Sequence, residues 1–228
     1  MNMDTGKLIE RLGESAGPVR PIPRVWRRAA IWLALAIPYI ALVVVVVSPR
    51  SDLMIKFSEW RFAIEQFAAL ATGVTAAVAA FAATIPGYNR KILMLPALPL
   101  ALWLGSLGQG CIQTWIQFGT NGLLLRPDWF CFPATILVGI VPAAAMAIML
   151  RRGAPLTPRI TASLGGLAAA GLGNFGLLLF HPQDASLMVL VWQIGTVFVL
   201  IMLAGWSGRY LLNWSSVIEP LRRRLAIG

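Results

Sequence analysis

The chain has 228 residues, of which 58% are hydrophobic and only 12% are charged. Soluble domains carry about 25% charged residues, so this composition argues against a soluble globular enzyme and indicates a membrane-embedded protein. The formal net charge is +10. Because the cations lie in loops and tails, they indicate membrane topology, and we expect no direct contact with nucleic acid.

Residues 1–28 form a polar segment that we expect to be a cytoplasmic tail. Asp4 or Thr5 can cap a short helix, and Gly13, Gly17 and Pro18 end it. Such a helix can lie on the membrane or dock in the groove of a protein, and a disordered tail fits the composition equally well. Its nearly neutral charge favours a protein partner. The apolar positions fall on one helical face: Leu8, Ile9 and Leu12.

Six apolar segments are each long enough to cross a bilayer as a helix. The sequence therefore predicts an all-α bundle over residues 29–206, followed by a basic cytoplasmic tail over 207–228. Small residues at four-residue spacing predict close helix packing in the second and fifth spans, at Ala69, Gly73 and Ala77 and at Gly165, Ala169 and Gly173. The predicted spans are 29–47, 62–84, 92–110, 132–150, 160–180 and 185–206.

The orientation follows from the distribution of lysine and arginine. With the N-terminus inside, 15 of the 19 Lys and Arg residues lie in inside segments. Cytoplasmic loops carry an excess of these residues, so both termini are predicted to be cytoplasmic. The lipid bilayer is therefore expected as one of its partners.

The two cysteines lie on either side of the longest predicted outer loop. Cys111 is expected to end the third span and Cys131 to begin the fourth, which places both at the outer face. One reading is a disulfide that closes the loop and contributes about 3 kcal/mol in the chain-entropy model. The other is a sensor whose thiols oxidise or bind a soft metal ion.

Three further ionisable residues are candidates for a role at the outer face. His181 and Asp184 lie in the hairpin between the fifth and sixth spans, where they could add ligands to the cysteines. Their spacing matches no metal motif, so a cap at Asp184 and an interfacial His181 are favoured. Glu65 lies in the second span, and Arg61 four residues earlier predicts an ion pair with it.

The sequence contains no phosphate-binding loop, nucleophile elbow or HExxH motif. We therefore predict no enzyme and no cofactor. A small polytopic transporter or channel component is the alternative, although its path would need more polar residues in the spans. A membrane thiol oxidoreductase would need a second dithiol to pass electrons on.

The order of these segments resembles the NrsF family, negative regulators of the ECF sigma factor sigma F. The resemblance extends over essentially the whole chain, and its most specific parts are the two-cysteine loop and the string HPQDASLMVL at 181–190. One departure is Gln193, where family members often carry a histidine. The other segments that carry it are 23–28, 65–73, 85–87, 102–104, 127–131 and 151–155.

The resemblance implies an inner-membrane anti-sigma factor whose cytoplasmic tail keeps a sigma factor from RNA polymerase. It also implies a response to oxidative or heavy-metal stress, with Cys111 and Cys131 as the sensing pair. The sigma-contact face would then be the apolar face of the tail, formed by Leu8, Ile9 and Leu12.

Overall fold

The structure is a computed structural model that describes residues 5–15, 23–119, 131–153 and 157–181, with seven single positions between 195 and 206. Helices form all the regular structure in these residues, and no strand occurs among them. Five of the helical segments are long and apolar enough to cross a membrane. The predicted class, an all-α bundle of membrane-spanning helices, is confirmed for this part of the chain.

Four of the predicted spans agree with the structure to within a few residues at either end. The helix α2 starts at Val25, so Arg27 and Arg28 are helical although we expected them in the tail. Long basic side chains can reach the membrane surface from inside a helix, so a cation does not mark the end of a span. The four helices are α2 (Val25–Val47), α4 (Trp60–Ala82), α6 (Cys131–Arg151) and α7 (Pro158–Leu177).

The third span differs from its prediction at both ends. It begins with a short 3-10 helix, η1 (Arg90–Met94), and continues after Pro96 as α5 (Ala97–Phe118). Proline has no N–H to donate to the preceding turn, which separates the two helices. The helix α5 passes the expected end and stops at Gly119, whose φ of 56° favours glycine. Cys111 therefore lies inside α5, and the prediction that it ends the helix was wrong.

The sixth predicted span, 185–206, lies largely outside the described residues. The seven positions of it that are described are all helical. A Cβ atom built on Gly205 would lie 2.7 Å from Ser163 Oγ, so this position lies against the first turns of α7. The helical positions are Gly195, Phe198, Val199, Met202, Leu203, Gly205 and Trp206.

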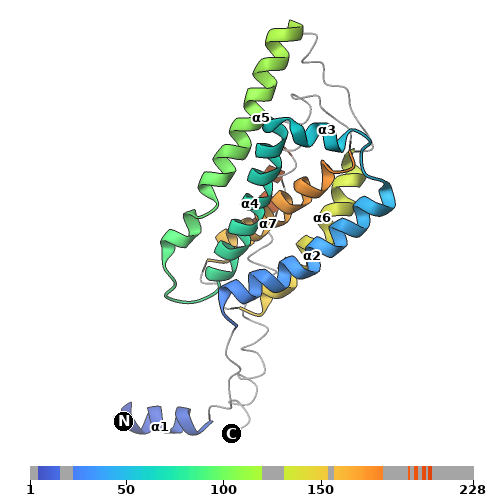
Figure 1. Cartoon of the computed structure of the whole chain (residues 1–228). Helices are drawn as coiled ribbons and strands as arrows, with labels where there is room; N and C mark the ends of the chain where they lie inside the picture. The colour runs from blue at the N-terminus through green and yellow to red at the C-terminus, as the bar shows by residue number, and fades with distance from the viewer. Residues whose placement is uncertain are drawn as a thin grey trace.

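The helices α4 and α7 form the centre of the bundle, with α5 on one side and α2 and α6 on the other (Figure 1). They cross at two glycines. A Cβ atom on Gly171 would lie 2.8 Å from the backbone nitrogen of Gly73 and 2.9 Å from the carbonyl oxygen of Ala69. Small residues permit this approach, which confirms the predicted stripe of α4.

The small-residue stripe of α7 packs against a different helix from the glycine crossing. A Cβ atom on Gly165 would meet Met146 and Leu150, and one on Gly173 would meet Gly139, all of which belong to α6. The helix α7 thus uses one small-residue face for α4 and another for α6. This is the geometry expected of a helix that is packed on two sides.

The helix α2 packs antiparallel to α6 and is held by two side chains that bond to backbone carbonyls. Trp32 is fully buried, and its Nε1 donates to the carbonyl oxygen of Pro142 at 2.9 Å. The hydroxyl of Tyr39 donates to the carbonyl oxygen of Leu137 at 2.5 Å. Both bonds join α2 to α6 inside the bundle, where water cannot serve as the hydrogen-bond partner.

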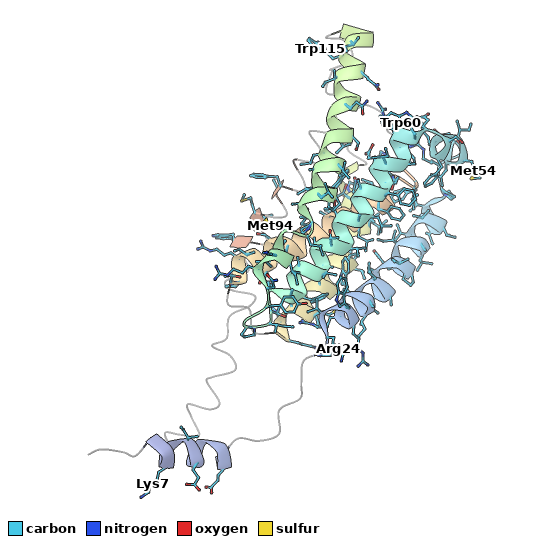
Figure 2. All side chains as sticks on the ribbon, turned by 60° about the vertical axis from the view of Figure 1, so that its left-hand side comes forward. Lys7, Arg24, Met54, Trp60, Met94 and Trp115 are labelled. Carbon is cyan, nitrogen blue, oxygen red and sulfur yellow. The ribbon has the colours of Figure 1, made fainter. Side chains whose placement is uncertain are left out.

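Two shorter helices lie outside the spans. The helix α1 (Thr5–Ser15) ends between Gly13 and Gly17, within the stretch that we expected to end it, and it is set apart from the bundle beyond the start of α2 (Figure 1). The helix α3 (Leu53–Ser58) connects α2 to α4 and was not predicted. It leaves Met54 83% exposed near Trp60 (Figure 2), as expected of a helix lying at the membrane surface.

Candidate functional site

The two ends of the bundle gather different residues. We call the end where α2 and α7 stop and α4 and α6 start the cysteine end, and the opposite one the arginine end. Figure 2 shows Arg24 at the arginine end, with Lys7 of α1 beyond it, and Trp60 and Trp115 at the cysteine end. Two ion pairs lie at the cysteine end, whereas several exposed cations lie at the arginine end.

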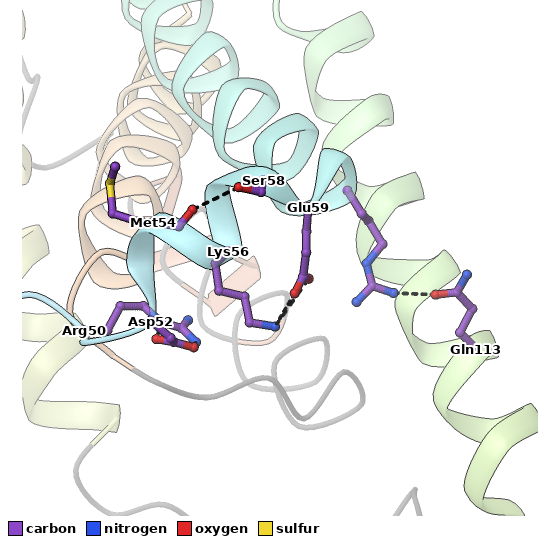
Figure 3. Close-up of polar contacts among 8 residues, drawn as sticks. Arg50, Asp52, Met54, Lys56, Ser58, Glu59 and Gln113 are labelled. Atoms are coloured by element: carbon purple, nitrogen blue, oxygen red, sulfur yellow. Dashed lines mark hydrogen bonds and ion pairs between the residues drawn. The ribbon is translucent and has the colours of Figure 1, made fainter.

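An ion pair between neighbours fixes the turn after α2 at the cysteine end. Arg50 donates from Nε and Nη2 to the two carboxylate oxygens of Asp52, at 2.6 and 2.7 Å (Figure 3). The backbone N–H of Arg50 donates to the carbonyl oxygen of Leu179, which ties this turn to the end of α7. The hydrogen bond from Arg50 holds the pKa of Asp52 below its ordinary value.

Polar contacts also join α3, α4 and α5 at this end. Lys56 forms an ion pair with Glu59 at 3.2 Å, and Arg61 Nη1 donates to Gln113 Oε1 at 2.6 Å (Figure 3). We expected Arg61 to pair with Glu65, but among the described residues it bonds to α5 instead. Glu65 is half-buried and has an interaction of its own. Arg61 therefore links two helices and does not serve one helix alone.

The backbone places both cysteines at this end, as predicted. Cys111 lies seven residues before the last residue of α5, and Cys131 is the first residue of α6. Their side chains lie outside what the structure describes, so the disulfide and the metal site stay predictions. His181 follows α7 here and is half-buried, and its backbone N–H donates to the carbonyl oxygen of Leu177.

The rest of the predicted metal site lies outside the described residues, since Asp184 is not among them. Within the described part of the chain no three His, Cys, Asp or Glu residues come together to hold a metal ion. The structure thus brings His181 to the same end as the two cysteines. Metal binding by these residues stays a prediction.

The predicted docking face lies on α1, as expected from its spacing. Leu8, Ile9 and Leu12 all fall within the helix, where their positions share one face. Ile9 is 66% exposed, and the side chains of Leu8 and Leu12 lie outside the described set. An exposed isoleucine on a helix set apart from the bundle is free to meet a partner.

The arginine end contains a buried cation that sequence reasoning treated only as a topology signal. Arg28 is 4% exposed and donates to Thr84 Oγ1 and to the carbonyl oxygen of Met149, both at 2.7 Å. Its guanidinium lies 4.6 Å from the centre of the Phe81 ring. A Cβ atom on Gly153 would lie 2.5 Å from Thr84 Cβ, so the turn after α6 closes over this contact.

We call these five residues the Arg28 cluster; they join the start of α2 to the ends of α4 and α6. The signal that could have found it is position. Ala29 and Trp32 follow Arg28 by one and four residues, so the three lie on one side of the helix. Ala29 is nearly fully buried and Trp32 is fully buried. A cation on the buried face of an amphipathic helix is expected to bond to the neighbouring helices.

Two buried amides between α4 and α7 were also missed. Gln66 is 1% exposed and Asn174 is 6% exposed, and neither amide has a hydrogen-bond partner within the described structure. Ala69 contacts Gly171, and the two amides lie three residues beyond this contact in antiparallel helices. They therefore lie at about the same depth, roughly 4.5 Å from the contact along each helix.

Together these features define a polytopic helical membrane protein with a separate amphipathic N-terminal helix. The family comparison agrees with this class and makes it specific. The chain belongs to the NrsF family, negative regulators of sigma F, whose family model matches residues 12–214. The resemblance drawn from the sequence is confirmed. No match was found among curated proteins or among solved structures.

The family description has two consequences for function. A negative regulator of sigma F implies a sigma factor as partner, and it points to regulation and away from an enzyme. The match starts at residue 12, within α1, so it includes Leu12 and leaves out Leu8 and Ile9.

Proposed function

We propose that the protein is a membrane-bound anti-sigma factor that holds an ECF sigma factor through its N-terminal tail, residues 1–28. It acts by binding and carries out no catalysis. The observation that carries this proposal is the family match over residues 12–214. It is supported by α1, because an amphipathic helix that cannot cover its own apolar face commonly docks in a hydrophobic groove.

The docking surface is the apolar face of α1. Because the family match starts at residue 12, the roles of Leu8 and Ile9 rest on the helix itself. The helix carries both signs of charge, which favours a protein groove over an anionic membrane surface. Its exposed charged side chains are Lys7, Glu10 and Glu14.

The orientation that this function needs places the tail in the cytoplasm. The bundle over 29–206 then spans the inner membrane, and the basic segment 207–228 is cytoplasmic as well. The arginine end supports this orientation, because the Arg28 cluster brings three separate basic segments to the side of the bundle where the tail begins.

The signal is sensed at Cys111 and Cys131, with His181, Asp184 and Glu65 as accessory groups at the same face. An envelope oxidant would take two electrons and two protons from the two thiols as a disulfide forms. A soft metal ion would instead bind the two thiolates. Either event acts on α5 and α6.

A route from α6 to the tail is available through the contacts of α2. Trp32 bonds to Pro142 in the middle of α6, and Arg28 bonds to Met149 near its end. The helix α2 continues directly into the tail, so a shift of α6 moves the point from which α1 is presented. A change of 1.4 kcal/mol in the binding free energy would alter the affinity for the sigma factor about tenfold.

The docking face is tested by purifying the tagged full-length protein in mild detergent and identifying what co-purifies. The test variant replaces Leu8, Ile9 and Leu12 with alanine, which keeps the helix because alanine has the highest helix propensity. We expect a sigma factor with the wild type and none with this variant. No sigma factor in any sample would refute the proposal and favour the transporter or channel alternative. The matched control replaces three polar residues of α1: Lys7, Glu10 and Glu14.

The sensing role is tested separately in cells. Cys111→Ser and Cys131→Ser variants should hold the sigma factor normally at rest and fail to release it under oxidant or metal stress. Expression of the sigma-dependent genes is the measurement. Normal induction in both variants would show that the cysteines do not sense the signal, while leaving the docking proposal intact.

A further inference from the structure

The charges of the described bundle are divided between its two ends. The acidic residues of this described bundle are Asp52, Glu59 and Glu65, and all three lie at the cysteine end. The described bundle here means residues 23–119, 131–153 and 157–181. The arginine end of the same residues therefore has exposed cations and no carboxylate. Six exposed cations that we call the basic ring are Arg24, Arg27, Arg90, Lys91, Arg151 and Arg152.

The basic ring is assembled by the fold, because its members come from three parts of the chain. Arg28 bonds to Thr84 and to Met149 at 2.7 Å, which joins the start of α2 to the ends of α4 and α6. Gly153 packs closely on Thr84 and holds the turn after α6 in place. The Arg28 cluster thus holds together the helix ends beside which the exposed cations lie.

The position of the ring relative to the spans indicates what it meets. Two of the candidate spans start at Val25 and Arg90, and a third ends at Arg151, so the ring lies at the level where apolar helices leave the membrane. Trp26 beside it is 65% exposed, as is typical of aromatic residues at the headgroup level. Lipid phosphates lie at this depth.

Apolar side chains continue from the ring toward the middle of the bundle. Met94 is 70% exposed and Leu98 is 72% exposed, directly after Arg90 and Lys91 in the chain. A ligand with an anionic head and apolar tails matches both surfaces. An acidic protein would account for the cations but not for the exposed apolar residues beside them.

We propose that the basic ring is a binding surface for anionic phospholipids, with lipid phosphates held by its arginines and acyl chains along the apolar surfaces of the spans that it borders. Arginine suits this role because its planar guanidinium can donate two hydrogen bonds to one phosphate. Basic pockets between membrane helices bind lipid headgroups in this way. The site stands independently of the sigma factor and of the cysteines.

The test measures lipid selectivity of the full-length protein in phosphatidylcholine vesicles. Spin-labelled phosphatidylglycerol or phosphatidylcholine is added in trace amount, and the motionally restricted fraction gives each relative association constant. Near a membrane surface one Lys or Arg contributes about 1 kcal/mol, or about fivefold in affinity. We expect a selectivity for phosphatidylglycerol of at least about fivefold. Raising the salt to about 1 M should weaken it, because the Debye length falls to about 3 Å.

Two pairs of substitutions locate the site. Arg151→Gln with Arg152→Gln, and separately Arg24→Gln with Arg27→Gln, should each reduce the selectivity at least about fivefold. Using two separate pairs keeps the test decisive if one variant fails to fold, which circular dichroism detects. The matched control, Lys56→Gln with Arg61→Gln, removes two cations from the cysteine end and should leave the selectivity unchanged.

Three results would overturn the proposal. An equal loss in the control would mean that the selectivity reflects total charge and not a site. Displacement of the labelled lipid by inorganic phosphate at low ionic strength would indicate a site for the free anion. An absence of selectivity in the wild type, with less sigma factor co-purifying with Arg151→Gln and Arg152→Gln, would make the basic ring a protein-binding surface.

Discussion

The close crossing of α4 and α7 predicts a large effect from adding a single methyl group. In Gly171→Ala, the new Cβ would lie 2.8 Å from Gly73 N, 2.9 Å from Ala69 O and 3.1 Å from Gly73 Cα. All three are backbone atoms, so no change of side-chain rotamer can relieve the overlap. The two helices must move apart along their whole contact.

The magnitude follows from two opposing contributions. Overpacking of a close contact costs about 1–3 kcal/mol, and here it also loosens the packing of the buried alanines around Gly73. Replacing glycine by alanine in a helix contributes about 0.8–1.0 kcal/mol in the other direction. We therefore expect a net loss of up to about 2 kcal/mol for Gly171→Ala.

The control is Gly108→Ala in α5, a glycine with nothing within 4 Å of its Cβ position. It should be neutral or stabilising by up to about 1 kcal/mol, because only the helix propensity changes. Reversible unfolding in mixed detergent micelles, followed by tryptophan fluorescence, gives both free energies. A Gly171→Ala protein as stable as Gly108→Ala would refute the close crossing.

Three further predictions concern single contacts. Arg28→Met should lower the free energy of unfolding by about 1.5–3 kcal/mol, measured in the same assay, because a carbonyl loses its charged donor. Trp32→Phe should lower it by about 1–3 kcal/mol, since a buried N–H bond and ring volume are both lost. The lowered pKa of Asp52 stabilises the fold above its ordinary pKa, so stability should fall as the pH drops through its folded value. An Asp52→Asn protein should lose part of that acid-side slope in a pH series.

The class of the protein and most of its helices follow from the sequence because the bilayer imposes a simple rule. A span must be long, apolar and helical, so composition and length alone locate it. The family resemblance added the sigma factor as partner, and the family match over 12–214 agrees with it. The helix α1 was predictable from its spacing, and it ends within the glycine- and proline-containing stretch that begins at Gly13.

The errors arose where a prediction from residues close in sequence was contradicted by the surrounding helical structure. The boundary at residue 110 failed because a glycine does not break a helix unless the backbone needs a positive φ, and α5 reaches such a position at Gly119. Arg61 bonds to Gln113, which is far away in sequence, and no ion pair with Glu65 is found among the described residues. Spacing along one helix carries no information about the next helix.

Composition and local periodicity are enough to predict a membrane bundle with a charged, amphipathic N-terminal tail. Which cations are buried and which are exposed depends instead on how the helices pack. Arg28 and Arg27 are adjacent in the chain, yet one is enclosed by α4 and α6 and the other faces outward. The difference arises because a helix turns by about 100° per residue, so two adjacent side chains point in different directions. The neighbouring helices cover only one of them.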